Sequence, residues 1–428
     1  MLIISKLRKV SLLKNASIYT GSNIFSALVP FICMPVLTRY LTPEDYGIVA
    51  IMGSLISFLT PFVGLNIDGA IAANYYHDSD NFTRFVKNCN SILVISSLVV
   101  VALIYIFSEY ISSYTLFPSD WLWSLVMICV CQFVYGVHLT MLQMKQQALN
   151  YGILQVLTVI FNSGLSIFLV VVLSMNWQGR VLAQVITVLA FMMGSIYYFS
   201  KNGLLGLAFD REYINKALNF GVPLIPHAIA GSLLTVVDRF FIANYVDIGV
   251  AGLFVLGAQI GSGMELLTSS FNKAYVPWLF KQLKNITYER KCKIVRYTYL
   301  YFLSVILIAI VYSLALPYLL VIFVGEKFYA SAQFVWPFAF AGAINGMYYM
   351  VVNYIFFTGH TAQLMYRTLL VGIIHTLLSY ILTCYYGVVG ACWCVLISHS
   401  VMFFIVWNLS NNVFKMPWFD KSIFQKSK

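Results

Sequence analysis

The stretch that decides the fold class is residues 91–109, which read SILVISSLVVVALIYIFSE. It carries no charge before Glu109, and it is close to the ~20 residues that a helix needs to cross a ~30 Å hydrocarbon core. Eleven further stretches are comparably apolar, so that 61% of the 428 residues are hydrophobic and only 10% are charged. Soluble proteins carry about 25% charged residues. The composition therefore excludes a soluble fold and predicts an all-α, polytopic membrane protein.

The twelve apolar stretches predict twelve membrane-spanning helices. Helices are expected because the strands of a membrane barrel alternate apolar and polar residues, and these stretches do not. We expect the spans at residues 15–38, 47–67, 91–109, 121–143, 151–173, 181–199, 218–244, 250–270, 297–324, 331–357, 367–386 and 389–410. The first span lacks the small-residue cleavage site of a signal peptide, so we expect it to remain in the protein.

The positive charges indicate the orientation of these spans. If both termini are cytoplasmic, 22 of the 26 Lys and Arg residues fall on the cytoplasmic side, only Arg39, Arg180 and Lys327 fall outside, and Arg239 lies within a span. Cytoplasmic loops of membrane proteins are enriched in Lys and Arg, and one missed helix would scramble every later loop. The pattern therefore predicts twelve spans with both termini in the cytoplasm. The outer connections are too short for a catalytic domain.

The spans divide into two halves of six. We expect an N-terminal lobe at residues 1–203, a cytoplasmic linker with an interfacial helix at 204–217, and a C-terminal lobe with a basic tail at 218–428. In each half two prolines precede an arginine: Pro30 and Pro35 before Arg39, and Pro223 and Pro226 before Arg239. Parallel repeats of this kind are typical of transporters. The four prolines are candidate hinges, because proline interrupts helical hydrogen bonding.

Motifs of catalysis are absent from the sequence. There is no H-E-x-x-H pair, no phosphate-binding loop and no nucleophile elbow. The eight cysteines show no metal-ligand spacing, and we interpret them as small buried hydrophobic residues. We expect a transporter rather than an enzyme, with no metal and no cofactor.

Ionisable residues inside the predicted spans are the candidate functional residues, because each is costly in lipid unless it faces protein or a water-filled cavity. Arg239 shares a helical face with Ser232 and Thr235, and is either an anion site or half of an ion pair between helices. Its neighbour Asp238 points to different residues, because adjacent positions do not share a helical face. His227 is either a packing residue or a substrate contact.

Glu265 lies on a line of small residues in span 250–270, close to its cytoplasmic end. It either exchanges a cation or proton during transport, or is hydrogen-bonded where two helices pack closely. Asp68 and Lys273 either flank an inward-facing mouth or anchor helices at the interface. Arg39 either contacts substrate or extends to the outer surface. After it, Thr42-Pro43-Glu44-Asp45 predicts a helix that Thr42 caps.

Four segments carry a family resemblance. They are LTRYLTPEDYG at 37–47, GLNIDGAI at 64–71 with the later pair Tyr75-Tyr76, ALNFGVPLIP at 217–226, and DRFF at 238–241 leading to AGLF at 251–254. Together they resemble the bacterial polysaccharide transporters, the O-antigen flippases of Wzx type in the multidrug/oligosaccharidyl-lipid/polysaccharide exporter superfamily. One departure is Ala73-Asn74, where many members carry a basic residue before the paired aromatics.

The resemblance implies two six-helix lobes around a central cavity in the bacterial inner membrane. It implies a flippase that moves a polyprenyl-pyrophosphate-linked oligosaccharide to the outer leaflet by alternating access, with ion coupling left open. Candidate substrate contacts are Arg239, Lys273, Arg39 and His227, and candidate ion-coupling residues are Asp238, Glu265 and Asp68. Expected partners are the lipid-linked glycan, membrane lipids and other glycan polymerisation and export proteins, but no nucleic acid. The alternative is a cation-coupled multidrug antiporter of the same superfamily.

Overall fold

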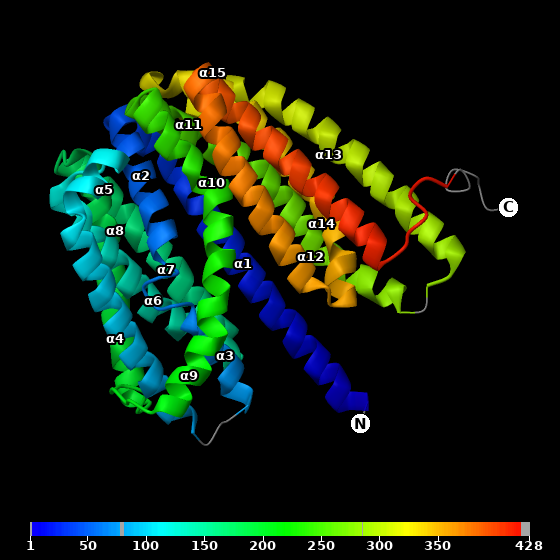
Figure 1. The fold of residues 1–428 in the computed structure, drawn as a ribbon, viewed down its shortest axis with the longest axis horizontal. Helices are drawn as coiled ribbons and strands as arrows, with labels where there is room; N and C mark the ends of the chain where they lie inside the picture. The colour runs from blue at the N-terminus through cyan, green and yellow to red at the C-terminus, as the bar shows by residue number, and fades with distance from the viewer. Residues whose placement is uncertain (1, 78–80, 285, 421–428) are drawn as a thin grey trace. The chain divides into compact units, whose positions relative to one another are not determined.

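The computed structural model describes residues 2–77, 81–284 and 286–420. It leaves out the side chains of residues 2–16 and of Tyr76, His77, His227, Leu319 and Thr361. Within the described ranges all regular structure is helical (Figure 1). The chain forms two compact units, Met1–Ile229 and Ala230–Lys428, which divide inside helix α10.

The first unit contains nine α-helices and three short helices of other types, in addition to the first residues of α10. The α-helices are α1 (Leu2–Tyr40), α2 (Pro43–Leu59), α3 (Ile67–His77), α4 (Phe82–Ile106), α5 (Ser108–Thr115), α6 (Leu122–Met144), α7 (Ala148–Ile167), α8 (Asn176–Lys201) and α9 (Arg211–Gly221). The 3₁₀ helices η1 (Ser119–Trp121) and η3 (Val222–Leu224) precede α6 and α10, and the π-helix η2 (Phe168–Val172) extends α7.

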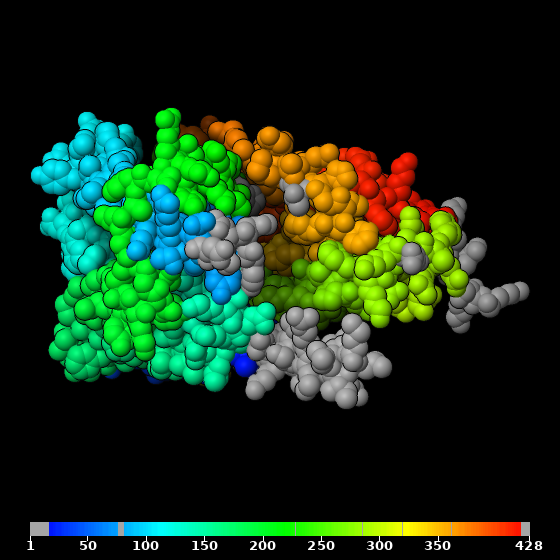
Figure 2. Space-filling view, turned by 90° about the horizontal axis from the view of Figure 1, so that it is seen from below, coloured from blue at the N-terminus to red at the C-terminus, as the bar shows by residue number. Residues whose placement is uncertain are grey.

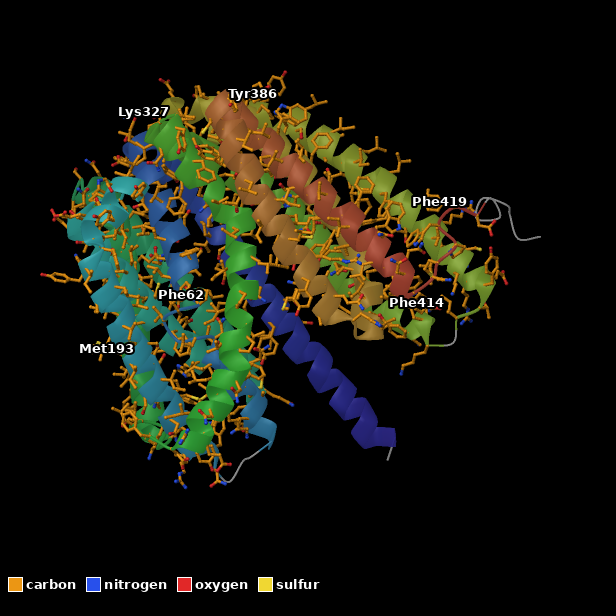
Figure 3. All side chains as sticks on the ribbon, viewed as in Figure 1. Phe62, Met193, Lys327, Tyr386, Phe414 and Phe419 are labelled. Carbon is orange, nitrogen blue, oxygen red and sulfur yellow. The ribbon has the colours of Figure 1, made fainter. Side chains whose placement is uncertain are left out.

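The second unit is built from the rest of α10 (Ile225–Tyr245), α11 (Ile248–Gly261), α12 (Gly263–Leu283), α13 (Tyr288–Phe323), the 3₁₀ helix η4 (Glu326–Phe334), α14 (Val335–Thr358) and α15 (Thr361–Val413). Helix α14 packs against α12, α13 and α15. Lys327 and Tyr386 lie at one end of this unit, and Phe414 and Phe419 lie at the other (Figure 3).

Nine helical segments of the described chain are long and apolar enough to cross a membrane. The number is ten if the two helical segments Arg211–Leu224 and Ala228–Tyr245, which meet at a bend, together form one span. Helix α2 has only 17 residues and lies outside this count. Segment Ala362–Val413 is counted once, although Gly387 inside it has non-helical dihedral angles and separates two helices. When the bent pair is counted as one span, these two observations account for the difference between ten and twelve, and twelve spans stays a prediction.

The predicted start of α2 is confirmed. Thr42 is the N-cap, Pro43 is the first helical residue, and Thr42 and Asp45 form a capping box. The Asp45 backbone amide donates to Thr42 Oγ1 at 3.2 Å, and the Thr42 amide donates to Asp45 Oδ2 at 2.9 Å. The end of α2 differs from the predicted span 47–67. The helix ends at Leu59, two residues before Pro61. The chain does not become helical again at once, because Leu65 and Asn66 have left-handed backbone conformations, with φ of 51° and 53°.

Two of the family-like segments contact each other within the first unit. A Cβ added to Gly221 would lie 2.1 Å from the backbone oxygen of Leu65, and one added to Gly69 would lie 2.9 Å from the ring of Phe220. Segments 64–71 and 217–226 therefore pack backbone against backbone. Glycine is needed at 221 for this approach and not for an unusual φ.

Hydrogen bonds and an ion pair attach the segment before α9 to α4, and blue and green surfaces of the first unit adjoin in Figure 2. Ser91 Oγ donates to the Ala208 oxygen at 2.7 Å, the Asp210 amide donates to Asn88 Oδ1 at 2.6 Å, and Arg84 pairs with Asp210 at 2.6 Å. Helix α9 buries Ala217 and Gly221 and leaves its charged residues exposed. The predicted linker, residues 204–217, thus consists of a non-helical segment that contacts α4 and the first part of α9.

The four candidate hinge prolines differ in their local structure. Pro30 and Pro35 lie inside α1, which stays helical through both. Pro223 lies in the 3₁₀ helix η3 and Pro226 lies in the first turn of α10. The helices on the two sides of this second pair are bent by 40°. Only the pair Pro223 and Pro226 therefore lies at a recorded bend between helices of the described chain.

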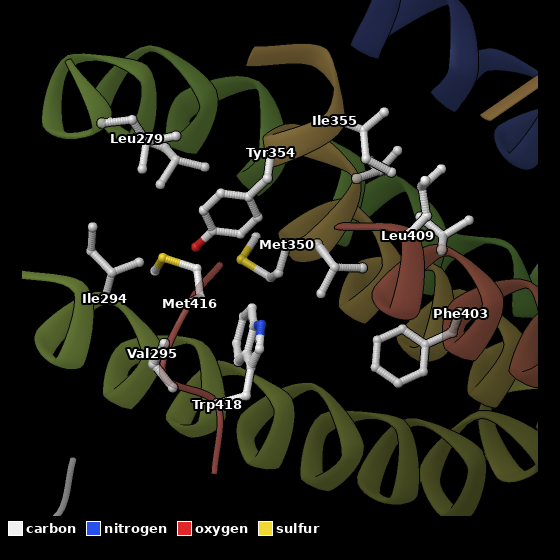
Figure 4. Close-up of a cluster of buried hydrophobic side chains, with 14 of the residues drawn as sticks. Leu279, Ile294, Val295, Met350, Tyr354, Ile355, Phe403, Leu409, Met416 and Trp418 are labelled. Atoms are coloured by element: carbon white, nitrogen blue, oxygen red, sulfur yellow. The ribbon is translucent and has the colours of Figure 1, made fainter. Parts of the chain in front are cut away.

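The core of the second unit is closed by the segment that follows α15 (Figure 4). Trp418 and Met416 are 3% and 6% exposed and pack on Tyr354 of α14 and Val295 of α13. Tyr299 Oη also donates to the Trp418 backbone oxygen at 2.6 Å. The segment after α15 thus folds back onto the unit and is part of its core.

Candidate functional site

A polar cavity of about 430 Å³ lies inside the second unit. Helices α10, α11, α12 and α14 and the second half of α15 form its wall. Its polar lining residues are Thr235, Asp238, Arg239, Gln259, Ser262, Glu265, Asn345 and His399. Its apolar lining residues are Leu234, Phe254, Val255, Ala258, Phe338, Ala341, Gly342 and Val395. Hydrogen-bonding groups of this number inside apolar helices indicate a binding site for a polar ligand.

Arg239 supplies the positive charge of this cavity. It lies on α10 with Thr235 one turn earlier, and its side chain is half-buried. The predicted face of Arg239 and Thr235 is therefore present, but Ser232 does not line the cavity. A guanidinium keeps its charge when desolvated and can bind two oxygens of a phosphate or carboxylate.

Asp238 points to a buried cluster beside the cavity. It is 4% exposed, Ser379 Oγ donates to its Oδ1, and His375 Nε2 lies 3.5 Å from that atom. The other ring nitrogen of His375 lies 2.9 Å from Ser398 Oγ and 3.4 Å from Cys394 Sγ. This cluster joins α10 to both halves of α15.

The same cluster contains atoms that could hold a metal ion. A carboxylate oxygen of Asp238, a ring nitrogen of His375 and Cys394 Sγ lie within 4.8 Å of one another, and all three residues are buried. Oxygen, nitrogen and sulfur atoms in such a group suit zinc. The hydroxyls of Ser379 and Ser398 already engage Asp238 and His375. The hydrogen bonds alone therefore explain why these polar side chains are stable in the apolar interior.

Glu265 reaches the cavity from α12 and is exposed to it. Asn345 Nδ2 on α14 donates to its Oε1 at 2.9 Å. The sequence places Glu265 near the end of the span 250–270, and in the structure it lies in the first turn of α12, within the 36-residue segment Ile248–Leu283. Helix α12 continues past the apolar stretch to Leu283.

Two glycines of α14 allow it to pack closely against α12 near Glu265. A Cβ added to Gly342 would lie 2.8 Å from the Glu265 amide nitrogen, and one added to Gly346 would lie 2.6 Å from Thr268. Thr268 Oγ1 donates to the Gly342 oxygen at 3.3 Å. Helices α12 and α14 thus pack closely while the Glu265 carboxylate faces the cavity.

The structure brings together three of the predicted site residues: Arg239, Asp238 and Glu265. Lys273 is on α12 but does not line the cavity, and it is exposed. Arg39, at the end of α1, and Asp68, in the first turn of α3, are exposed residues of the first unit. The side chain of His227 lies outside the described part of the chain.

Several cavity residues could not be assigned to a functional site from the sequence. Gln259, Asn345 and His399 were recognisable only as polar residues within apolar spans, and Ser262 carried no signal. Asn345 also donates to Tyr349 Oη at 3.2 Å, and His399 Nδ1 lies 2.8 Å from the Val395 oxygen. Their common position on one cavity depends on three-dimensional contacts that helical periodicity does not give.

The amino-terminal and central part of the chain matches a family model. Residues 12–283 match the family described as "Polysaccharide biosynthesis protein". The chain belongs to this family. The predicted membership of a polysaccharide-transporting family is thereby confirmed.

Curated relatives span most of the chain. A "Lsg locus putative protein 1" of Haemophilus influenzae is 23% identical over 397 residues, which are 88% of this chain and 94% of the relative. An uncharacterized membrane protein of the same organism is 26% identical over 86% of this chain and 89% of its own length. The "Capsular polysaccharide biosynthesis protein CapF" of Staphylococcus aureus is 22% identical over 65% of this chain and 69% of its own length.

Two solved structures share the fold. The chain resembles "Lipid II flippase MurJ, inward closed conformation", with a TM-score of 0.75, 14% identity, and 91% of this chain and 87% of that one covered. It also resembles an inward-facing multidrug resistance MATE family transporter, with a TM-score of 0.63, 15% identity, and coverage of 90% and 94%. The chain is therefore a multi-pass membrane protein that is helical in its described part, and family and fold agree with a transporter rather than an enzyme.

Proposed function

We propose that the protein is a flippase for a lipid-linked glycan. It carries a polyprenyl-pyrophosphate-linked oligosaccharide, an O-antigen or related repeat unit, from the cytoplasmic to the outer leaflet of the bacterial inner membrane. Twelve helices in two six-helix lobes enclose the path, both termini are cytoplasmic, and transport proceeds by alternating access. The family match and the fold shared with a lipid II flippase support this proposal.

The observation that carries the proposal is the cavity around Arg239. Each sugar hydroxyl costs several kcal/mol to move into hydrocarbon without a hydrogen-bond partner. Amides, hydroxyls and an imidazole on the cavity wall offer such partners, and the half-buried ring of Phe338 offers an apolar surface to sugar rings. Arg239 offers two N–H donors to a phosphate.

Ion coupling is a further part of the proposal. Asp238 and Glu265 are the acidic residues of the Arg239 cavity, and Asp68 is an exposed acid at the start of α3. We propose that coupling to an ion gradient, where it exists, acts through Asp238 or Glu265. The competing function, a multidrug antiporter, rests on the MATE fold, which the chain shares to a lower TM-score than the fold of the lipid II flippase.

The test is glycan export in cells that depend on this protein. Arg239→Ala should abolish export, and Arg239→Lys should retain part of it, because lysine keeps the charge but not the two-pronged geometry. Arg296→Ala, which removes an exposed arginine of α13 outside the cavity, is the matched control and should export normally. Normal export by a well-expressed Arg239→Ala protein would refute the assignment, and a gain in drug resistance without glycan export would favour the antiporter.

A further inference from the structure

The carboxylate of Glu265 lies in the Arg239 cavity, and in the described residues no Lys or Arg pairs with it; the ionisable side chain nearest in the lining is the imidazole of His399. The hydrogen bond of the carboxylate comes from the neutral amide of Asn345 at 2.9 Å. In the described part of the chain no Lys or Arg nitrogen is recorded within 4.0 Å of it, and the ion pairs found are Arg84–Asp210 and His375–Asp238. A charged group inside a membrane is costly unless something compensates it, and a cationic group on the ligand would supply that compensation.

The charges of the cavity do not balance when an anion alone binds. Its charged lining residues are Asp238, Glu265 and Arg239, and because Asp238 is paired with His375, the charges of Glu265 and Arg239 cancel before a ligand binds. A phosphate bound to Arg239 adds at least one more negative charge. Like charges repel strongly where the surroundings have a low dielectric constant. A ligand that brings a positive group together with its phosphate avoids this penalty.

The atoms beside Glu265 suit a protonated amine. Asn345 Nδ2 donates both to Glu265 Oε1 and to Tyr349 Oη, at 2.9 and 3.2 Å, so Asn345 Oδ1 remains as an acceptor next to the carboxylate. An ammonium has three N–H donors and a charge. It can use both acceptors at once, whereas a sugar hydroxyl donates one hydrogen bond and leaves the charge of Glu265 uncompensated.

We propose that the cavity selects a glycan head group that carries a free, protonated amino sugar beside its phosphate, with Arg239 holding the phosphate and Glu265 and Asn345 holding the ammonium. This inference rests on the proposed function, which supplies the phosphate. It adds a substrate class, a zwitterionic amino sugar unit, and a specificity-determining role for Glu265 and Asn345.

The test compares three probes that share one phosphate and differ at one substituent. Glucosamine 1-phosphate, N-acetylglucosamine 1-phosphate and glucose 1-phosphate are titrated at pH 7 against the purified full-length protein in lipid nanodiscs. We expect glucosamine 1-phosphate to bind about tenfold more tightly than the others, the size of one charge-assisted contact. Glu265→Gln should remove this preference, Glu265→Asp should keep part of it, and Glu289→Gln, at an exposed acid of α13, should leave it unchanged.

The outcomes separate the two proposals. Equal affinities for the three probes, or an amine preference that survives in Glu265→Gln, would overturn the amino sugar inference while leaving the anion site intact. Glucose 1-phosphate that reaches the affinity of glucosamine 1-phosphate when sodium is added or the pH is lowered would also overturn it, because the compensating cation would then come from solution. Affinities that are unchanged by Arg239→Ala, or no measurable binding of any probe, would refute the phosphate site and the inference with it.

Discussion

Gly221→Ala tests whether the contact between segments 64–71 and 217–226 holds the first unit together. The added Cβ would lie 2.1 Å from the Leu65 oxygen and 3.2 Å from the Asn66 carbonyl carbon. Both are backbone atoms, and Leu65 and Asn66 already have φ of 51° and 53°, so they cannot rotate away as a flexible side chain would. The chain has to move by more than 1 Å, roughly the difference between 2.1 Å and an ordinary contact above 3.4 Å.

The size of the effect follows from two opposing terms. Forcing an extra methyl group into a packed site costs about 1–3 kcal/mol, and more where only backbone can yield. Alanine in place of glycine in a helix contributes roughly 0.5–1 kcal/mol in the other direction. We therefore expect Gly221→Ala to lower the free energy of unfolding by about 1–2 kcal/mol and to reduce glycan export at the same expression level.

The assay is thermal unfolding of the purified protein in detergent, followed by size-exclusion fluorescence. Gly136→Ala in α6 is the matched control, because a Cβ at Gly136 meets nothing within 4 Å. It should unfold at the temperature of the unmodified protein or slightly above it. If Gly221→Ala were as stable as Gly136→Ala, the packing of segments 64–71 and 217–226 would not be the contact described.

Three further predictions concern caps, strain and topology. Thr42→Ala should lower the free energy of unfolding by about 1 kcal/mol, because the Asp45 amide loses its hydrogen-bond acceptor, whereas Thr42→Ser keeps a hydroxyl acceptor and should keep the stability. Equal melting temperatures for the two variants would contradict the role of Thr42 as the cap. Gly387→Ala should lower the free energy of unfolding by roughly 1–3 kcal/mol, because residues with a side chain rarely adopt its φ of 59° with ψ of −145°. Gly359→Asn should be nearly neutral, because asparagine tolerates the left-handed φ of 77° and ψ of 11°, and thermal unfolding that ranks the two variants in reverse would refute this. Alkaline phosphatase fused after Lys327 should be active and fused after Lys428 inactive, and activity at Lys428 would contradict cytoplasmic termini.

Hydropathy predicts where helices cross the membrane better than where they end. The predicted span 91–109 covers the end of α4, which begins at Phe82, and the start of α5. The predicted span 297–324 ends one residue beyond α13, which begins nine residues earlier, at Tyr288. Apolar runs record contact with lipid, whereas a helix continues into water until a cap ends it. Thr287, whose Oγ1 accepts from the Arg290 amide at 3.4 Å, sets the start of α13 and lies outside any apolar run.

The candidate site could be predicted only in part, for a related reason. Arg239, Asp238 and Glu265 were identifiable because a charge within an apolar span is visible in the sequence. Asn345 was not, because its importance comes from Glu265, 80 residues earlier, and His375 was not, because its partner Asp238 is in a different helix. Contacts of this range depend on how α12, α14 and α15 pack, and no local pattern records that packing.

The adjacency of Asp238 and Arg239 gives α10 two separate roles. Successive residues point about 100° apart around a helix, and here one side chain is buried against Ser379 and His375 while the next is half-buried on the cavity. The buried contacts of Asp238 with α15 therefore fix the rotation of α10 about its own axis, and that rotation sets where the Arg239 guanidinium lies in the cavity. A change at Ser379 or His375 should consequently alter anion binding at Arg239 without contacting the ligand, and it should do so more than a change at exposed Lys273, which shares the unit but not this cluster.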